Sequence, residues 1–468
     1  MPATSGKVES GPGAAPRVAL LTSSLGSGHM RAARAIETAL REQCPGIETR
    51  QFDFWSLMDA SVADSVRRAY LSLVENAPEL YERLYQLDQR HWRDILVHQD
   101  QPPPTLLAEA ARNFISAPTR VPRPDDPRHG FDRVLFRLLR AALAGQGPVS
   151  PGSRVWRKLL KNGIGLSWAL MARRLYAGLR AFAPDVVVAT QMHPATLFSL
   201  AKSRGWLDVP ALAVLTDFGM HDFWHQPGFD LYCVPHASIA AEAGSGHRPG
   251  AMVATGIPLM PGFRDPPEPR EARRQLQIDL DRPTVLVLGG GLGLGVDAVT
   301  ERLLARLPDV QFLVLTGNNA FARTALTALA DRYPGRLGVW GWSDQVAVFM
   351  RAADVVVGKP GGLTVAEALA CGRPLLATHA LRGQESFNVR FIEAQGVGRL
   401  VTEAALPMAL ESLLADRAEL ARIQQRAWTL GRCDAAARIA ALTLACASAS
   451  APASAPASSA PAPAAGES

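Results

Sequence analysis

The side chains best suited to chemistry lie where apolar runs give way to glycine-rich loops. His29 ends the loop SLGSGH, residues 24–29, which follows the apolar run RVALLT and precedes an alanine-rich helical segment. Glycine lets a ligand approach the backbone, and the free N–H groups at a helix start favour phosphate. The same positive end disfavours imidazolium, so His29 is expected to be neutral and able to accept a proton. A histidine that only caps its helix is the alternative.

A second glycine-rich loop, GGGLGLG at residues 289–295, follows the apolar run TVLVLGG. Neither loop contains a complete GxGxxG, and the next apolar run ends in Asn318 and Asn319 rather than in an acid. The dinucleotide fingerprint requires both features, so NAD or FAD is not indicated. Tight turns of an ordinary α/β fold explain each loop alone, but less easily both.

The most informative stretch is KPGGLTVAEALACGRP, residues 359–374. Its glycines form a loop after an apolar run that predicts a buried strand. Thr364 and Glu367 then have the spacing of a helix capping box, in which the glutamate bonds backbone. At the ligand-binding edge of a sheet, Glu367 could instead accept two ribose hydroxyls.

A polar loop follows the next apolar run as well. The stretch GQESFN brings Gln384, Glu385 and Asn388 to the same expected sheet edge. Two polar clusters at successive strand ends favour a binding site over solvated loops.

A third polar cluster, in LTDFGMHDFWH, follows the run ALAVLT and contains Asp217, His221, Trp224 and His225. The absence of HxH or HExxH spacing argues against a metal site, and these side chains are expected to line a cleft. The five cysteines are far apart and include no CxxC pair, which argues against zinc and disulfides and favours a reducing cytoplasm.

Strands and helices must position these loops. Val- and Leu-rich runs alternate with helical segments in two series, separated by the Pro-rich stretch 261–272. Such continuous apolar strands are typical of parallel sheets covered on both faces. The sequence therefore predicts an α/β protein with two Rossmann-like parallel-sheet domains facing a cleft. The expected strands are 17–22, 185–190, 211–216, 284–290, 312–317, 337–342, 354–362 and 374–379.

The predicted organisation has four parts. They are a flexible leader at 1–16, an N-terminal domain at 17–265 with an insertion at about 97–153, a C-terminal domain at 270–440, and a disordered Ala/Pro/Ser tail at 447–468. The N-terminus has no apolar run of the kind that a signal peptide requires, and no window reaches 18 apolar residues without a charge.

Charge is unevenly distributed along the chain. The formal charge is +6, but residues 111–180 hold fourteen basic and three acidic side chains, so the rest of the chain is −5. Residues 154–180 mix these cations with tryptophan and leucine, as interfacial helices do, although packing on their own domain is the alternative. The expected membrane contacts are Arg154, Trp156, Arg157, Lys158, Lys161 and Trp168. No RNA-binding signature accompanies the charge, so nucleic acid is not an expected partner.

Several of these stretches together carry a resemblance. They are LTSSLGSGHMRAARAI, PDVVVATQMHPA, LTDFGMHDFWH, ATGIPLMPGF, LGGGLGLG and KPGGLTVAEALACGRPLLATHALRGQESFN. They resemble the monogalactosyldiacylglycerol synthase and processive diacylglycerol glucosyltransferase group, MurG-like family 28 glycosyltransferases with the GT-B fold. The resemblance covers about residues 17–96 and 155–440. The loop LGSGH departs from the plant-type GGGH, and residues 97–153 have no counterpart.

The resemblance implies inverting transfer of a hexose from UDP-glucose or UDP-galactose to the free hydroxyl of diacylglycerol, without a metal or other cofactor. It implies that His29 is the base or acceptor-binding group and that Glu367 holds the donor ribose. The other implied donor-binding residues are Gly290, Gly291, Gly362, Thr364, Gln384, Glu385 and Asn388. The residues expected on the acceptor side of the cleft are Gly28, Asp217, His221 and Trp224.

The expected partners are therefore a UDP-sugar, diacylglycerol and an anionic membrane surface. The expected location is cytoplasmic, peripheral on the inner face of the cell membrane. Three alternatives stay open: another lipid or polyprenyl-linked acceptor for the same donor, a nucleotide-sugar epimerase, and a catalytically silent binding protein. These residues do not decide between glucose and galactose.

Overall fold

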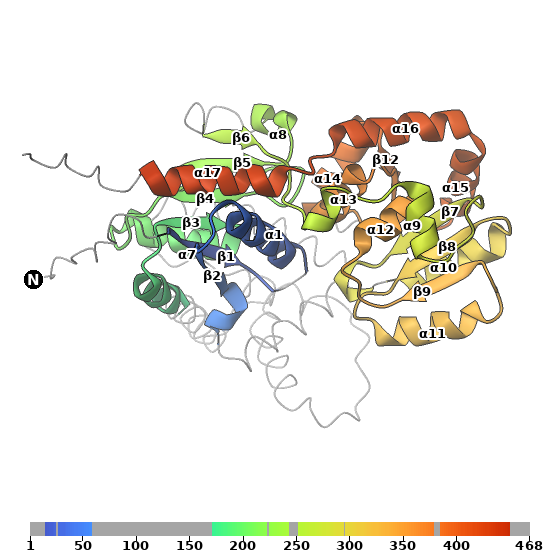
Figure 1. Cartoon of the computed structure of the whole chain (residues 1–468), viewed down its shortest axis with the longest axis horizontal. Coiled ribbons are helices and arrows are strands. Elements are labelled where there is room, and N and C mark those ends of the chain that lie inside the picture. The colour runs from blue at the N-terminus through green and yellow to red at the C-terminus, as the bar shows by residue number, and fades with distance from the viewer. Residues whose placement is uncertain are drawn as a thin grey trace, which may run out of the picture.

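Two parallel sheets form the framework of the protein (Figure 1). The computed structural model describes residues 15–24, 27–58, 171–221, 224–242, 251–293, 295–378 and 384–449. Each sheet contains six strands in these ranges, and every strand pairing in them is parallel. The predicted α/β class with two parallel-sheet domains is confirmed.

The first sheet has the strand order β2-β1-β3-β4-β5-β6. Its strands are β1 (Arg17–Thr22), β2 (Glu48–Asp53), β3 (Val186–Ala189), β4 (Ala211–Val214), β5 (Leu231–Val234) and β6 (Met252–Ala254). Its helices include α1 (Ser27–Gln43), α7 (Met192–Ser203), α8 (Ala237–Glu242) and helical residues 171–182. A short 3-10 helix, η1 (Phe54–Leu57), follows β2.

The second sheet has the strand order β12-β11-β10-β7-β8-β9. Its strands are β7 (Thr284–Leu288), β8 (Gln311–Leu315), β9 (Leu337–Trp340), β10 (Val355–Gly358), β11 (Leu375–Ala377) and β12 (Gly398–Leu400). Its helices are α9 (Pro269–Gln275), α10 (Val296–Arg306), α11 (Ala320–Ala330), α12 (Val346–Ala352), α13 (Gly362–Ala370), α14 (Gln384–Ala394), α15 (Leu406–Ala415) and α16 (Arg417–Leu430). Two 3-10 turns, η5 (Pro261–Phe263) and η6 (Gly290–Leu292), complete this half.

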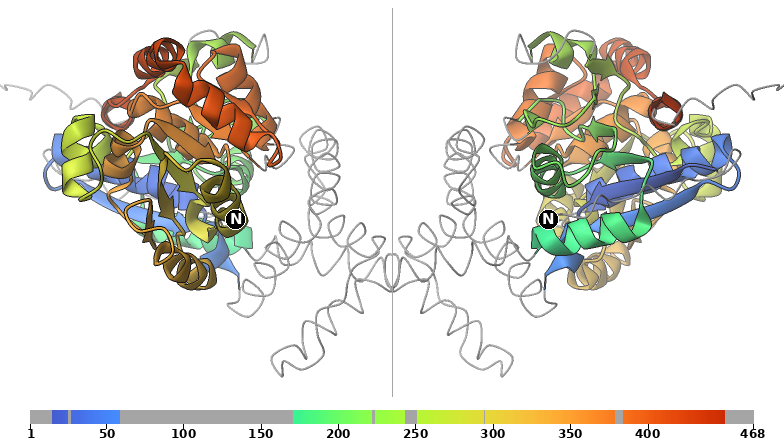
Figure 2. Two further views of the ribbon diagram at one scale, coloured as in Figure 1. Left: turned by 90° about the vertical axis from the view of Figure 1, so that its right-hand side faces the viewer. Right: turned by 90° about the vertical axis from the view of Figure 1, so that its left-hand side faces the viewer.

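Alternate strand residues face opposite sides of each sheet and are buried on both. Val18 and Leu20 of β1 pack in one apolar cluster, whereas Ala19 and Leu21 pack in another. The second sheet divides in the same way, so helices cover both faces of each (Figure 2). Double burial is why the strands are continuous apolar runs rather than alternating patterns.

Each sheet has a point where successive connections leave in opposite directions. In the first sheet β1 lies between β2 and β3, and in the second β7 lies between β8 and β10. Loops diverge at the carboxyl end of the sheet at such a switch point, which leaves a crevice there. The helices that follow β1 and β10, α1 and α13, contact one another. The two crevices therefore open toward each other.

The last described helix, α17 (Ala435–Ala449), returns to the first domain and packs along α1 (Figure 1). Its buried face includes Ala436, Ile439, Ala440 and Ala447, a spacing that places these residues on one side of a helix. The structure thus differs from the expected domain boundary at 440 and the expected tail start at 447. Residues 435–449 form part of the packing around β1 because their apolar stripe is covered only there.

The six side chains expected to contact a membrane, and the insertion at 97–153, lie outside the described residues. Within the described ranges, no helix combines the length and the apolar character needed to cross a bilayer.

Candidate active site

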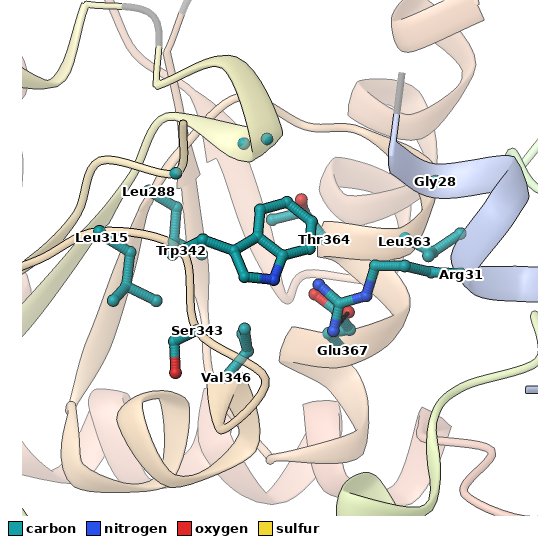
Figure 3. Close-up of a pocket in the computed structure, with 14 residues that line it drawn as sticks. Gly28, Arg31, Leu288, Leu315, Trp342, Ser343, Val346, Leu363, Thr364 and Glu367 are labelled. Atoms are coloured by element: carbon teal, nitrogen blue, oxygen red, sulfur yellow. Dashed lines mark ion pairs between the residues drawn. The ribbon is translucent and has the colours of Figure 1, made fainter. Parts of the chain in front are cut away.

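A pocket lies between the carboxyl ends of the two sheets and is lined by both domains (Figure 3). The first domain contributes Gly28 and Arg31 from α1. The second domain contributes the loops after β7, β8 and β9 and the first turns of α13. The pocket thus lies where the two switch points face each other, as expected for a ligand site in open α/β sheets.

The glycine loop after β7 is held in place by the loop after β8. The backbone N–H of Asn318 donates to the carbonyl of Gly291 at 3.0 Å, and the Asn319 amide donates to the carbonyl of Gly293 at 3.0 Å. Gly293 has φ +60°, and a Cβ there would overlap the carbonyl oxygen of Thr316. Only glycine therefore allows the two loops to pack so closely, which fixes the position of Gly290 and Gly291 in the pocket wall.

Glu367 does not form a capping box with Thr364. The N-cap of α13 is Gly361 and no side chain caps the helix, so Thr364 already lies inside the first turn. The Glu367 carboxylate is buried and pairs with Arg31, with 3.3 Å between Oε1 and Nη2. Burial raises the pKa of Glu367, and the Arg31 charge opposes that rise. The capping interpretation is wrong, and the carboxylate is available to the pocket.

His29 bonds the ends of two neighbouring strands rather than its own helix. Its Nδ1 lies 2.9 Å from the carbonyl oxygen of Thr190 and 3.1 Å from the hydroxyl of Thr216. Because a carbonyl oxygen only accepts, Nδ1 carries the proton and the lone pair of the neutral ring is on Nε2. Burial lowers the pKa of His29 to about 4, although the bond to Thr190 opposes this. The helix-cap alternative is wrong, and the ring is a neutral proton acceptor at pH 7.

His193, in the first turn of α7, the helix that follows β3, was not predicted as a site residue. Burial lowers its pKa to about 4, and the neighbouring charges of His29 and His221 contribute to the lowering. Three histidines that follow the neighbouring strands β1, β3 and β4 therefore lie close enough for His29 and His221 to influence His193. The ring of Phe54 stacks on His193 with 5.3 Å between centroids. The sequence pattern that pointed to the other site residues also fits His193, because this histidine follows a buried strand as they do.

Asp217, Gly362 and Asn388 connect the two domains; we call these three residues the domain contact. The Asn388 side chain is fully buried. Its Oδ1 accepts from the backbone N–H of Phe218 at 2.6 Å, and its Nδ2 donates to Asp217 at 2.9 Å and to the Pro360 carbonyl at 3.0 Å. These bonds use both N–H groups of the amide and one lone pair of Oδ1, and the side chain is fully buried, so Asn388 is bonded into the domain contact rather than to the pocket.

Gly362 packs against the first domain rather than facing the pocket. A Cβ at this position would overlap the Thr216 carbonyl oxygen, and the Gly362 N–H bonds the Asp217 carboxylate. Burial raises the pKa of Asp217, and the bond from Asn388 opposes this most strongly. The first backbone N–H of α13, at a glycine that was expected to bind the donor, is therefore bonded to a carboxylate of the other domain.

The remaining predicted residues do not line the pocket together, and each has its own surroundings. Glu385 is buried and forms an ion pair with Lys359 at 2.7 Å, and Gln384 is the first residue of α14. His221 is buried. Trp224 packs in the apolar core of the first domain, so its side chain anchors the loop after β4 to that core. Gly28, Gly290, Gly291, Thr364 and Glu367 are the predicted residues that the structure brings together around the pocket.

Arg31 and Trp342 line the pocket but were not predicted. The Trp342 indole is 43% exposed and lies across the pocket from Arg31 and Glu367 (Figure 3). Among the described residues, no group of three or more His, Cys, Asp or Glu side chains could hold a metal ion.

Two family models match the chain. Residues 157–259 match monogalactosyldiacylglycerol (MGDG) synthase, and residues 284–429 match the glycosyltransferase family 28 C-terminal domain. The second match spans the strands and helices from β7 to α16, so this part of the chain is similar to a family 28 glycosyltransferase C-terminal domain. The pocket wall formed by the β7 loop and α13 belongs to this domain, and the resemblance found in the sequence is confirmed.

Curated relatives agree with both matches. The chain is 28% identical over 252 residues to the processive diacylglycerol beta-glucosyltransferase of Bacillus licheniformis, covering 53% of this chain and 65% of that protein. It is 30% identical over 240 residues to a probable monogalactosyldiacylglycerol synthase 2 of Oryza sativa, covering 48% of this chain and 51% of that protein. The matched region thus spans between half and two thirds of these relatives.

Among solved structures, the chain is similar to MurG of Acinetobacter baumannii. The TM-score is 0.52 at 15% identity, and the match covers 92% of this chain and 99% of that one. At this identity the likeness shows the fold alone, and it confirms the predicted GT-B architecture.

Proposed function

We propose that the protein is a glycosyltransferase that moves a hexose from UDP-glucose or UDP-galactose to the free hydroxyl of diacylglycerol, with inversion at the sugar C1. The observation that carries the proposal is the position of His29 in the first turn of α1, two residues before Arg31, which lines the pocket and pairs there with the buried carboxylate of Glu367. The names of the diacylglycerol glucosyltransferase and monogalactosyldiacylglycerol synthase relatives support glucose or galactose as the hexose and diacylglycerol as the acceptor.

The donor binds in the pocket. The Glu367 carboxylate accepts hydrogen bonds from the ribose hydroxyls, and the backbone at Gly290 and Gly291 approaches the diphosphate. The exposed indole of Trp342 offers a flat apolar face on which the uracil ring can stack. In this proposal backbone N–H groups and side chains bind the phosphates, so no metal ion or other cofactor is required.

His29 acts as the general base. Its Nε2 takes the proton of the acceptor hydroxyl while that oxygen attacks C1 from the face opposite UDP. The bond from C1 to the diphosphate oxygen breaks, and its electron pair leaves with UDP. The negative charge of the donor raises the pKa of His29 from about 4, so the base becomes stronger when the donor is bound.

Three groups from the first domain hold the base in this orientation. The Thr190 carbonyl fixes the Nδ1 tautomer, the Thr216 hydroxyl contacts the same nitrogen, and the Thr190 hydroxyl donates to the His29 carbonyl at 3.2 Å. Because the ring is already fixed, Nε2 does not have to be oriented toward the acceptor hydroxyl during the reaction. This lowers the entropic part of the activation free energy of transfer.

The acceptor is a membrane lipid, so the protein must reach a bilayer surface. We propose that the basic segment with Arg154, Arg157, Lys158 and Lys161 binds anionic headgroups on the inner face of the cell membrane. Each engaged cation would contribute roughly 1 kcal/mol. Sedimentation with anionic vesicles tests this, and unchanged binding after neutralising all four cations would contradict it.

A radiolabel assay tests the catalytic proposal. Purified protein is incubated with diacylglycerol vesicles and either labelled UDP-glucose or labelled UDP-galactose, and chloroform-soluble label is counted. Label from one donor supports the proposal and identifies the hexose. Label that appears only with a polyprenyl-linked acceptor keeps the donor and corrects the acceptor, and UDP-sugar converted without an acceptor indicates an epimerase.

A further inference from the structure

The pocket contains one cation and one anion among the described residues that line it, Arg31 and Glu367. They come from different domains and pair with each other, and both side chains are largely buried, 17% and 7% exposed. The charges of the empty pocket therefore balance.

A nucleoside diphosphate changes this balance. If Glu367 binds the ribose, the carboxylate remains charged while the diphosphate adds further negative charge to a space with little water. A charge in that setting is costly unless a counter-charge lies nearby. Arg31 is the pocket-lining side chain in the described part of the chain that can supply it.

Arg31 also has suitable chemistry and position. A guanidinium offers five donors in a planar fork that matches two phosphate oxygens. Arg31 lies in the first turns of α1, two residues after His29, and the same pocket contains the Gly290 and Gly291 backbone. Two other cations in the described part of the chain come near this edge, and neither lines the pocket: Lys359 is held by Glu385 at 2.7 Å, and Arg323, whose Nη1 lies near Gly341, lines a neighbouring pocket.

We propose that Arg31 is a diphosphate-binding residue, and that Glu367 holds its guanidinium in place while the pocket is empty. This inference rests on the proposed donor site and goes beyond it by assigning the counter-charge of the leaving group. When the bond to C1 breaks, the diphosphate gains negative charge, so Arg31 binds the transition state more strongly than the donor.

The position of Arg31 also has a structural consequence. The glycine loops and Glu367 belong to the second domain, whereas Arg31 belongs to the first. A diphosphate in the pocket is therefore bound from both sides of the cleft, which links nucleotide binding to the closed arrangement of the domains.

Calorimetric titration of the full-length protein with UDP and with uridine tests the inference. Both ligands carry the ribose and the base, and only UDP carries the diphosphate. In Arg31→Gln the preference for UDP over uridine should fall by about tenfold to a hundredfold, the range for hydrogen bonds to charged groups, while uridine affinity changes by less than about twofold. Arg34→Gln, an exposed arginine on the same helix, is the matched control and should retain the preference.

Two outcomes overturn the inference in different ways. A wild-type protein that prefers UDP, with the same preference in Arg31→Gln, removes Arg31 from the diphosphate site and leaves the proposed function intact. A wild-type protein that binds neither ligand overturns the donor site and this inference with it. If Arg31→Gln does not fold because Glu367 is left buried and unpaired, the double variant with Glu367→Gln is compared with Glu367→Gln alone and should show the same loss. Arg31→Lys keeps the charge but loses the planar fork, so its preference for UDP should lie between those of the wild type and Arg31→Gln.

Discussion

The pocket and the domain contact meet at the start of α13, where Gly362 belongs to the contact and Leu363, Thr364 and Glu367 line the pocket, yet they satisfy their polar groups differently. In the domain contact, the Asn388 amide and the Asp217 carboxylate bond each other and backbone, and Asn388 is fully buried. In the pocket, Glu367 has a cation at 3.3 Å, and Gly290, Gly291 and Trp342 line open space. Polar groups whose hydrogen bonds are made within the protein stabilise the arrangement of the domains. Polar groups that keep unused donors or acceptors can bind a ligand.

This difference separates two kinds of variant. Changes in the pocket and at His29 should alter turnover or nucleotide affinity with little effect on stability. Changes in the domain contact should lower stability and leave the binding of small nucleosides to the second domain unaltered.

The largest effect is expected for His29→Ala. Removal of a general base lowers turnover by about a hundredfold to ten-thousandfold, and UDP affinity should change little because the donor pocket is intact. Steady-state rates and UDP titration on the same preparation measure both quantities. Near-normal turnover would remove His29 from the role of base.

A smaller effect on binding is expected for Trp342→Ala. Base stacking on an aromatic ring is worth about 1–3 kcal/mol, so uridine and UDP should weaken together by about tenfold. Phe321→Ala, which removes an 80% exposed ring on α11 away from the pocket, is the control and should leave both affinities unchanged. A loss confined to UDP would contradict the stacking role.

Gly362→Ala tests the domain contact. The added Cβ overlaps the Thr216 carbonyl oxygen, so the two domains must move apart or strain, at a cost of about 1–3 kcal/mol in the free energy of unfolding. Urea denaturation measures the loss. Gly262→Ala, where a Cβ meets nothing within 4 Å, is the matched control. Uridine binding should survive in Gly362→Ala, and its loss would place this glycine in the pocket after all.

The smallest expected effect concerns acid stability. The pKa of His193 is about 4 in the folded protein against an ordinary 6.5, so between these values the unfolded chain binds more protons. The stability that this residue contributes is complete above about pH 6.5 and is lost as the pH falls toward 4. His193→Gln should therefore lose less unfolding free energy between pH 7 and pH 5 than the wild type, as measured by urea denaturation at each pH. An equal loss would show that His193 titrates normally.

The strands that flank the site could be predicted from the sequence because double burial makes them continuous apolar runs. Strand β2 could not, because its residues, ETRQFD, are mostly polar and partly exposed at the edge of the sheet. Strand β12 has only three residues, two of them exposed. The return of α17 to the first domain depends on contact with α1, which lies about 400 positions earlier, and no local pattern encodes such a contact.

Within the site, the sequence singled out loops that meet at the pocket but not which of their side chains line it. The pattern Thr364-x-x-Glu367 fits a capping box and a cleft carboxylate equally well, and the residue at which α13 begins decides between them. The family resemblance implied that Asn388 and Gly362 bind the donor, whereas in the structure both contact the other domain. No sequence pattern indicates a role for Arg31, because it comes close to Glu367 only where the two domains face each other.

The central claim is that hexose transfer to diacylglycerol takes place at this pocket. The most direct measurement compares the wild type with Glu367→Ala in the vesicle assay, with labelled UDP-glucose and UDP-galactose in parallel. We predict chloroform-soluble product from one of the two donors with the wild type, and at least about tenfold less with Glu367→Ala because the ribose loses its charged hydrogen-bond acceptor. Absence of labelled lipid from both donors, or equal product from both proteins, would contradict the account.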